Sequence, residues 1–132
     1  MKILQLWSVG DTGTAINPSH CEQQLQSAAI MQLGLSMFEE MIFDQGQLIN
    51  GSLLDYQVAS FKDLPDSFRP IIVQVPHETG PFGAKGAGET GALTVAPAIA
   101  NAIHDAVGVR IRDLPLTAER VLRALAEKNR QA

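Results

Sequence analysis

A glycine-rich run from Gly80 to Gly91 constrains this chain more than any other feature of its sequence. Its glycines surround one lysine, Lys85, and a single carboxylate, Glu89, stands near its end. Because glycine has no Cβ, such a run can adopt left-handed backbone angles and can bring successive N–H groups close to an anionic ligand. The run therefore predicts a binding loop with an acid/base residue beside it.

Apolar periodicity outside this run predicts strands and helices that alternate along the chain. Short apolar runs rich in β-branched residues predict three strands: a buried strand at 3–9, a central strand at 71–75 and a short strand at 109–111. Spacings of three and four favour helices at 19–40, 94–108 and 117–128. Ser19 and Glu22 match a capping box for the first helix, and Gly108 matches a stop signal for the second.

Two further segments complete the predicted order of elements. Apolar residues on both sides of Asp44-Gln45-Gly46 predict a short hairpin over 41–49, and 50–69 is expected to be extended or irregular. Strands that interleave with helices predict an α+β fold, a two-layer arrangement with a mixed sheet and helices packed on one face. A length of 132 residues fits a single domain over 1–132.

Charge and cysteine content exclude several classes of partner. The net charge is −4 and the basic residues are scattered, so no face is predicted for nucleic acid or for a membrane surface. Cys21 is the only cysteine, which rules out an internal disulfide and a cysteine-based cluster and fits a reducing compartment. No signal peptide or membrane-spanning run is apparent, so a cytoplasmic location is expected.

Several short motifs occur together in a recognisable order. Before the glycine run they are Val9–Gly13, Ile16–Pro18, Gly34 with Glu39-Glu40, and Gly51–Tyr56. The loop Gly83–Glu89 comes next, followed by the Ala-rich segment 91–108 and by Asp113–Thr117. In this order they resemble the C-terminal end of the molybdopterin-binding large subunit of the xanthine dehydrogenase/aldehyde oxidase family of molybdenum hydroxylases. That subunit is several times longer, so the chain is expected to be only its last part.

The resemblance implies a role for the glycine loop and for Glu89. It implies that Glu89 is the catalytic base when a metal-bound hydroxide hydroxylates an aldehyde or an N-heterocycle, because a base must remove the hydroxyl proton. The cofactor is expected to be molybdenum-molybdopterin, cradled by the backbone of Gly83, Ala84, Lys85, Gly86, Ala87 and Gly88. Iron–sulfur clusters and FAD are expected only on other chains or domains.

The implied partners are the remaining part of the large subunit, iron–sulfur and flavin subunits, and a small-molecule substrate. One position departs from the family pattern: Met31 and Gln32 stand where the family has a glutamine followed by a glycine. Gln24 and Gln32 are therefore the candidate substitutes for that cofactor contact. A methionine at helical spacing favours core packing.

Simpler interpretations stay open beside the catalytic one. The glycine run by itself is also typical of a plain surface turn, Glu89 of a carboxylate at a helix start, and Lys85 of a solvated lysine. Three histidines show no metal-site spacing, so no metal ligands are predicted among His20, His77 and His104. Two alternative functions remain, a catalytically inactive assembly module and, through the GxGxxG pattern of Gly86–Gly91, a nucleotide-binding domain.

Overall fold

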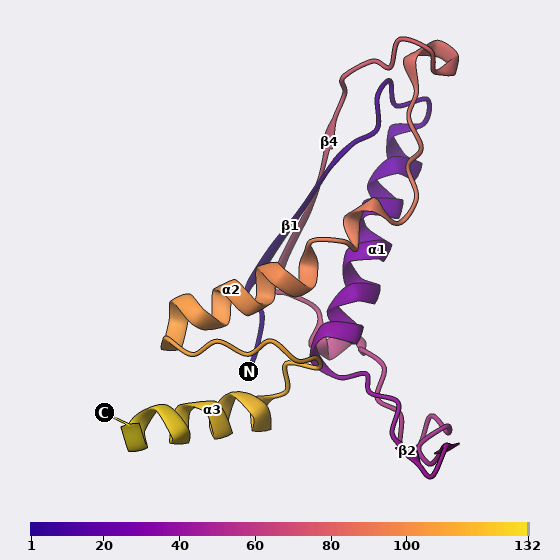
Figure 1. Cartoon of the computed structure of the whole chain (residues 1–132). Coiled ribbons are helices and arrows are strands. Elements are labelled where there is room, and N and C mark those ends of the chain that lie inside the picture. Colours follow the sequence, from indigo (N-terminus) through magenta and orange to yellow (C-terminus); the bar gives the residue numbers. More distant parts are fainter. Residues whose placement is uncertain (132) are drawn as a thin grey trace.

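Two parallel strands form the main sheet of the protein. A computed structural model describes residues 1–131, in which β1 (Gln5–Asp11) pairs with β4 (Ser67–Val73) over their full lengths, from Gln5 opposite Ser67 to Asp11 opposite Val73. The two strands run side by side down the molecule (Figure 1). Both were predicted, but each boundary differs: β1 begins two residues after 3, and β4 begins four residues before 71.

The expectation of a central strand near 71–75 is wrong for this chain. Within residues 1–131 β4 pairs with β1 alone, so it is an edge strand, and it contains Pro70 opposite Ser8. Proline cannot donate to a ladder and is tolerated only where one side of a strand needs no partner. The prediction rested on the apolar run 71–75, which leaves out Pro70, whereas the strand itself covers Ser67–Val73 and contains this proline.

Helix α1 (Pro18–Met37) follows β1 and packs against both strands. The predicted capping box of Ser19 and Glu22 is wrong. Asn17 is the cap, its side-chain Oδ1 accepting a hydrogen bond from the N–H of His20 at 3.2 Å, and Pro18 takes the first helical position, where its missing N–H costs nothing. The helix ends at Met37, three residues earlier than expected.

The predicted hairpin is present and projects from the molecule as β2 (Phe43–Asp44) and β3 (Gln47–Leu48) (Figure 1). Its turn residues Gln45 and Gly46 have φ of 44° and 83°, as the right-handed twist of a two-residue hairpin turn requires. The buried Asn50 secures its base, accepting from the N–H of Ile42 and donating to the carbonyl of Glu40. Residues 50–66 are irregular, as expected, apart from a 3-10 turn η1 (Phe61–Asp63).

Two helices complete the chain. Helix α2 (Val95–Val107) closes at Gly108, whose φ of 68° is the left-handed cap that its position predicted. Helix α3 (Ala118–Gln131) starts at Thr117, whose hydroxyl accepts from the N–H of Arg120 at 3.2 Å. Arg120 also pairs with Glu40 at 2.6 Å, which ties the start of α3 to the segment that follows α1.

The short strand expected at 109–111 does not form. Val109 is instead buried in the main hydrophobic core, so its apolar character serves packing and not a strand ladder. That core lies between the inner face of the sheet, α1 and α2, and its buried members are Ala29, Leu33, Met37, Val95, Ile99, Ile103, Val109 and Leu116.

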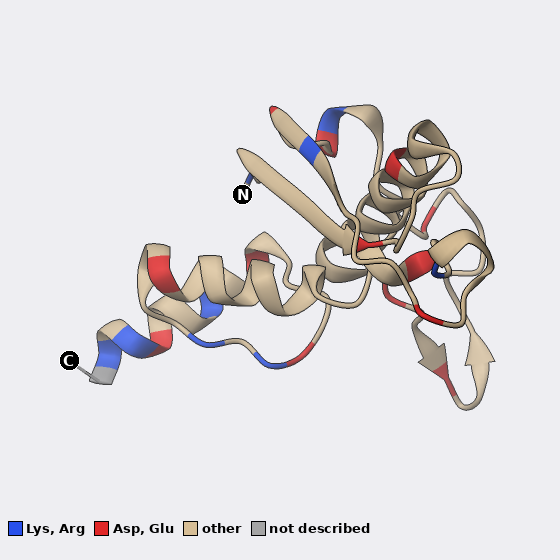
Figure 2. Ribbon diagram, turned by 90° about the horizontal axis from the view of Figure 1, so that it is seen from above, with Lys and Arg blue, Asp and Glu red and all other residues tan. Residues whose placement is uncertain are grey.

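Helices cover one face of the β1–β4 sheet, and the α+β class is confirmed, with a parallel pair and an antiparallel pair as two small sheets. The outer face of the main sheet leaves apolar side chains exposed, namely Trp7, Val9, Ile71 and Val73. Charged residues of both signs are spread over several elements (Figure 2). Within residues 1–131 no helix is long and apolar enough to span a bilayer.

Candidate functional site

The glycine run docks at the carboxyl ends of β1 and β4. The N–H of Lys85 donates to the carbonyl of Thr12, and the N–H of Thr14 donates to the carbonyl of Gly83, both at 2.9 Å. These bonds surround an isolated antiparallel bridge between Gly13 and Ala84. The run therefore sits at the top of the two strands (Figure 1), where parallel strands present their carboxyl ends to ligands in open α/β sheets.

The turn that leads into the loop is tightly constrained. The 3-10 turn η2 (Pro81–Gly83) contains Phe82 at φ 54° and Gly83 at φ 79°. The carbonyl of Gly83 accepts two hydrogen bonds, from the N–H of Thr14 and from the N–H of His77. A Cβ on Gly83 would lie 2.8 Å from the Thr14 hydroxyl, so glycine is required there for closeness as well as for its backbone angle.

Asp11, at the end of β1, joins this loop to both strands. Its carboxylate accepts from the N–H of Gly13 at 2.9 Å, from the N–H of Val75 at 3.1 Å and from the ammonium of Lys85. The hydrogen bond from Lys85, with those from Gly13 and Val75, lowers the pKa of Asp11 from 3.8 to about 2. Asp11 was not singled out from the sequence, although a carboxylate that ends a strand before a glycine turn is a usable signal.

Beyond Lys85 the loop bares its backbone. The N–H groups of Gly86, Ala87 and Gly88 donate no hydrogen bond within residues 1–131. A Cβ on Gly86 or Gly88 would meet nothing within 4 Å, so the space beside both glycines is open. Consecutive free donors next to open space fit the oxygen-rich groups of a pterin with its phosphate, as the resemblance to the molybdenum hydroxylases implies.

Glu89 begins the 3-10 turn η3 (Glu89–Gly91), which packs on α1 and β1. The carboxylate of Glu89 is exposed and makes no hydrogen bond or ion pair in the described part of the chain. Gly91, two residues on, is buried against α1, which fixes the turn that carries Glu89. The chain thus presents this carboxylate on its surface, three residues or fewer from the free N–H groups.

Two buried hydroxyls, one on β1 and one just past its end, were not singled out from the sequence. Ser8 and Thr12 are 5% and 3% exposed, and neither side-chain oxygen has a hydrogen-bond partner in residues 1–131. Ser8 faces η3, its Oγ lying 2.9 Å from the position of a Cβ on Gly91. A serine or threonine in an apolar strand is too common a pattern to have marked these positions.

The candidate amides lie on α1. Gln24 is exposed and Gln32 is half-buried. The backbone carbonyl of Gln32 accepts from the Ser36 hydroxyl at 2.6 Å, and its side-chain amide takes no part in that bond. Met31 is 44% exposed, so the expectation that it packs in the core is wrong. Its thioether lies on the helix surface because the core stripe of α1 passes through Ala28, Ala29 and Leu33 instead.

The nucleotide-binding alternative lacks the required geometry. β4 ends at Val73 and α2 begins at Val95, so Gly86–Gly91 lies between them as an extended loop and a 3-10 turn. A dinucleotide fingerprint needs a strand that turns directly into a helix at its glycines. Among residues 1–131 there is also no group of three His, Cys, Asp or Glu side chains that could hold a metal ion.

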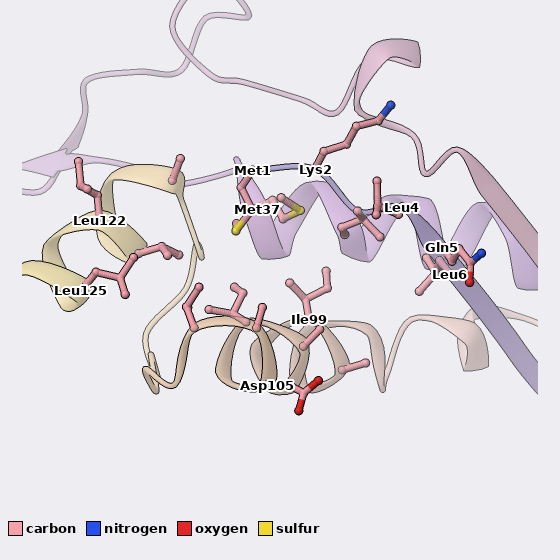
Figure 3. A pocket seen from close by; sticks show the side chains of 18 of the residues that line it. Met1, Lys2, Leu4, Gln5, Leu6, Met37, Ile99, Asp105, Leu122 and Leu125 are labelled. Carbon is pink, nitrogen blue, oxygen red and sulfur yellow. The ribbon is translucent and has the colours of Figure 1, made fainter. Parts of the chain in front are cut away.

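An apolar groove lies away from the glycine loop. It has a volume of about 1080 Å³ and runs between the N-terminal segment Met1–Trp7 and the helices α2 and α3 (Figure 3). Met37, Ile99 and Leu125 line it, and Leu122 stands at its wall. The groove opens at the amino end of β1, whereas the anchored part of the glycine loop follows its carboxyl end and η3 with Glu89 packs beside Ser8 in the middle of the strand.

Comparisons with known proteins agree with the sequence motifs. The family model described as a molybdopterin cofactor-binding domain matches residues 1–65. The probable hypoxanthine oxidase XdhD of Escherichia coli K12 is 37% identical over 126 residues, covering 95% of this chain and 13% of that protein. The nicotine 6-hydroxylase large subunit of Paenarthrobacter nicotinovorans is 34% identical, covering 94% of this chain and 16% of its own length.

Solved structures show the same relationship. Quinoline 2-oxidoreductase from Pseudomonas putida 86 superposes with a TM-score of 0.87 at 32% identity, covering 96% of this chain and 16% of that one. Aldehyde oxidoreductase from Desulfovibrio gigas gives a TM-score of 0.84 at 31% identity, with 95% and 14% covered. The chain therefore spans about a seventh of the relatives it matches, and it belongs to the molybdopterin-binding subunits of the xanthine dehydrogenase/aldehyde oxidase family.

Proposed function

We propose that this chain supplies the cofactor loop and the catalytic base of a molybdenum hydroxylase that oxidises an aldehyde or an N-heterocycle. One observation carries the proposal: the free N–H groups of Gly86, Ala87 and Gly88 lead directly into the unpaired carboxylate of Glu89. The names of the relatives support the substrate class, since they act on hypoxanthine, nicotine, quinoline or aldehydes.

The chain's own residues would hold the cofactor and move a proton. The backbone donors of Gly86–Gly88 bind pterin or phosphate oxygens, and Gln24 and Gln32 are the candidate side-chain amides on α1. The bound molybdenum-molybdopterin supplies the two-electron oxidation. Glu89 accepts the proton that the oxygen nucleophile loses as it attacks the substrate carbon.

Glu89 must be shielded from water by a covering segment to act as an effective base. On this chain it is exposed, and a carboxylate in water is a weak base at neutral pH. Burial beside the cofactor would remove that water and make the carboxylate a stronger base. In this proposal the remaining part of the large subunit provides that cover, with iron–sulfur and flavin groups carried by other chains or domains.

Exposed apolar surfaces support the need for further polypeptide. The outer face of the sheet exposes Trp7 and Ile71, and the hairpin exposes Phe43 and Ile49. Parallel sheets are normally covered on both faces. We propose that the rest of the subunit covers the sheet face, so the chain alone retains no molybdenum and oxidises no substrate.

Replacement of Glu89 in the reconstituted complex tests the catalytic role. Glu89→Gln is expected to lower kcat at least about a hundredfold, a typical loss for a general base, while the molybdenum content stays unchanged. Glu78→Gln is the matched control, because Glu78 is an exposed glutamate in the turn before the loop. Retained turnover in Glu89→Gln would remove Glu89 from the mechanism.

The second candidate function is an inactive assembly module, which the exposed position of Glu89 favours. It predicts that the complex forms and retains its cofactor but shows the same turnover with Glu89→Gln as without it. Elemental analysis for molybdenum, together with the Glu89→Gln kinetics, separates the two functions.

A further inference from the structure

The side chains of Asp11 and Lys85 meet at the base of the glycine loop, although they are 74 positions apart in the sequence. We infer that they are positioning residues, whose ion pair holds the loop at the ends of β1 and β4 so that its free N–H groups and Glu89 face the cofactor. The inference deepens the proposed function and rests on it for the identity of the ligand.

Lys85 is held at two points. Its N–H donates to the carbonyl of Thr12 at 2.9 Å, and its ammonium donates to the carboxylate of Asp11. The side chains of Lys85 and Asp11 are 29% and 34% exposed, so the pair is partly shielded from water. The N–H groups of Gly86–Gly88 donate no hydrogen bond within residues 1–131. The position of these free donors therefore depends on Lys85, the last residue of the loop that is held in place.

Asp11 is itself fixed from both strands. Its carboxylate accepts from the N–H of Gly13, just past β1, and from the N–H of Val75, just past β4. The carboxylate therefore connects three segments, the ends of two parallel strands and the loop. A group that connects rigid elements to a bare loop limits the loop's motion, which is how a supporting residue keeps a site in its productive geometry.

The same contacts argue against a direct cofactor contact for the Lys85 side chain. Its ammonium is engaged by a carboxylate, and a phosphate would have to compete with Asp11 for it. Lys85 thus acts through the backbone that it holds, and the N–H groups after it make the contact. A positioning role and a direct phosphate contact differ in the effect expected from Asp11. If the ion pair positions the loop, removal of Asp11 and removal of Lys85 should lower cofactor binding equally.

The chain contains a matched control pair. Lys2 forms an ion pair with Asp66, and these two residues precede β1 and β4 at the opposite end of the same strands. Removal of Lys2 therefore deletes a lysine–aspartate pair across the same sheet without touching the loop.

The test uses Lys85→Met, Asp11→Asn, their double variant, Lys85→Arg and Lys2→Met. Asparagine keeps an oxygen to accept from Gly13 and Val75, so Asp11→Asn removes chiefly the charge. Amide hydrogen exchange in the full chain, alone and with the rest of the subunit, reports the bonds donated by Thr14 and Lys85. Both single variants should speed exchange at these amides about two- to fivefold, as expected for a lost, partly exposed ion pair.

The double variant should exchange no faster than either single one, Lys85→Arg should match the unmodified chain, and Lys2→Met should leave these amides unchanged. In the complex, Lys85→Met and Asp11→Asn should lower retained molybdopterin by the same factor, with no further loss in the double variant. This equality is a result that a direct lysine–phosphate contact would not give.

Unchanged exchange at the amides of Thr14 and of residue 85 in the Lys85→Met variant would overturn the inference. So would a molybdopterin loss much larger in Lys85→Met than in Asp11→Asn, with the two losses multiplying, because Lys85 would then be a ligand. The exchange measurement needs no cofactor. If the unmodified complex holds no molybdopterin, the proposed function fails while the exchange result still decides whether the pair anchors the loop.

Discussion

Gly91 packs so closely on α1 that a Cβ at its position would lie 2.8 Å from the carbonyl oxygen of Leu25. The backbone of η3 therefore rests on the backbone of α1, and the turn that begins with Glu89 is held at a fixed height along the helix. A contact of this kind leaves no room for adjustment by a side-chain rotation, because the atom it meets belongs to the main chain.

Gly91→Ala is accordingly expected to push η3 away from α1. The clash should cost about 1–3 kcal/mol of unfolding free energy, the usual cost of overpacking, and should lower the Tm. Gly86→Ala is the control, because nothing lies within 4 Å of its added Cβ, and it should leave the Tm unchanged. Thermal unfolding followed by circular dichroism makes the measurement, and equal Tm values for both variants would contradict the contact.

The Asp11 carboxylate should stay largely charged until the pH falls to about 2. Its folded pKa of about 2 lies below its ordinary value of 3.8, so it stabilises the fold above pH 3.8 and loses that contribution as the pH falls toward 2. Lys85→Met removes the main cause of the lowered pKa and should move it up toward 3.8. Carbon-13 NMR of the carboxyl group between pH 1.5 and about 6 measures both values. An unchanged Asp11 pKa in Lys85→Met would exclude the interaction.

The start of α1 gives a prediction about stability. Asn17→Ala should destabilise the chain by about 1 kcal/mol, because the N–H of His20 loses its acceptor. Ser19→Ala should be nearly neutral, since Ser19 lies within the first turn and caps nothing. Urea unfolding at neutral pH measures the free energy of unfolding of both variants. A larger loss for Ser19→Ala than for Asn17→Ala would favour the capping box of Ser19 and Glu22 over the Asn17 cap.

Met31 offers a test of the departure from the family pattern. Because its side chain is 44% exposed, Met31→Gln should change the unfolding free energy by less than about 0.5 kcal/mol. In the reconstituted complex it should raise the amount of molybdopterin retained after gel filtration, since it adds the amide that the family places there. Met31→Leu, which adds no hydrogen-bonding group, is the control. Equal retention in the glutamine and leucine variants would count against a cofactor contact at this position.

Local signals in the sequence were reliable where one residue decides the backbone. Gly108 predicted the end of α2, and Asp44-Gln45-Gly46 predicted the hairpin, because positive φ angles there admit few residue types. The strand expected at 109–111 failed because an apolar run is the same whether its side chains enter a ladder or a core. Val109 enters the core.

Long-range relationships were out of reach of the sequence. The glycine run and Glu89 stood out by composition, but the approach of Lys85 to Asp11 depends on how β4 pairs with β1. The exposure of Met31 likewise depends on which side of α1 meets α2 and the sheet. Both the ion pair and the exposure of Met31 follow from strand register and helix packing. Short sequence motifs contain no information on either.

The placement of the apolar groove at one end of β1 and of the anchor of the glycine loop at the other has an evolutionary consequence. Trp7 lines the groove and Asp11 holds Lys85, and four residue steps along the strand separate them, roughly 13 Å at the usual rise per residue. A substitution at the amino end of β1 can therefore reshape the groove for a different neighbour without touching the contacts that hold the loop. In related chains the two ends of this strand are free to change independently of each other.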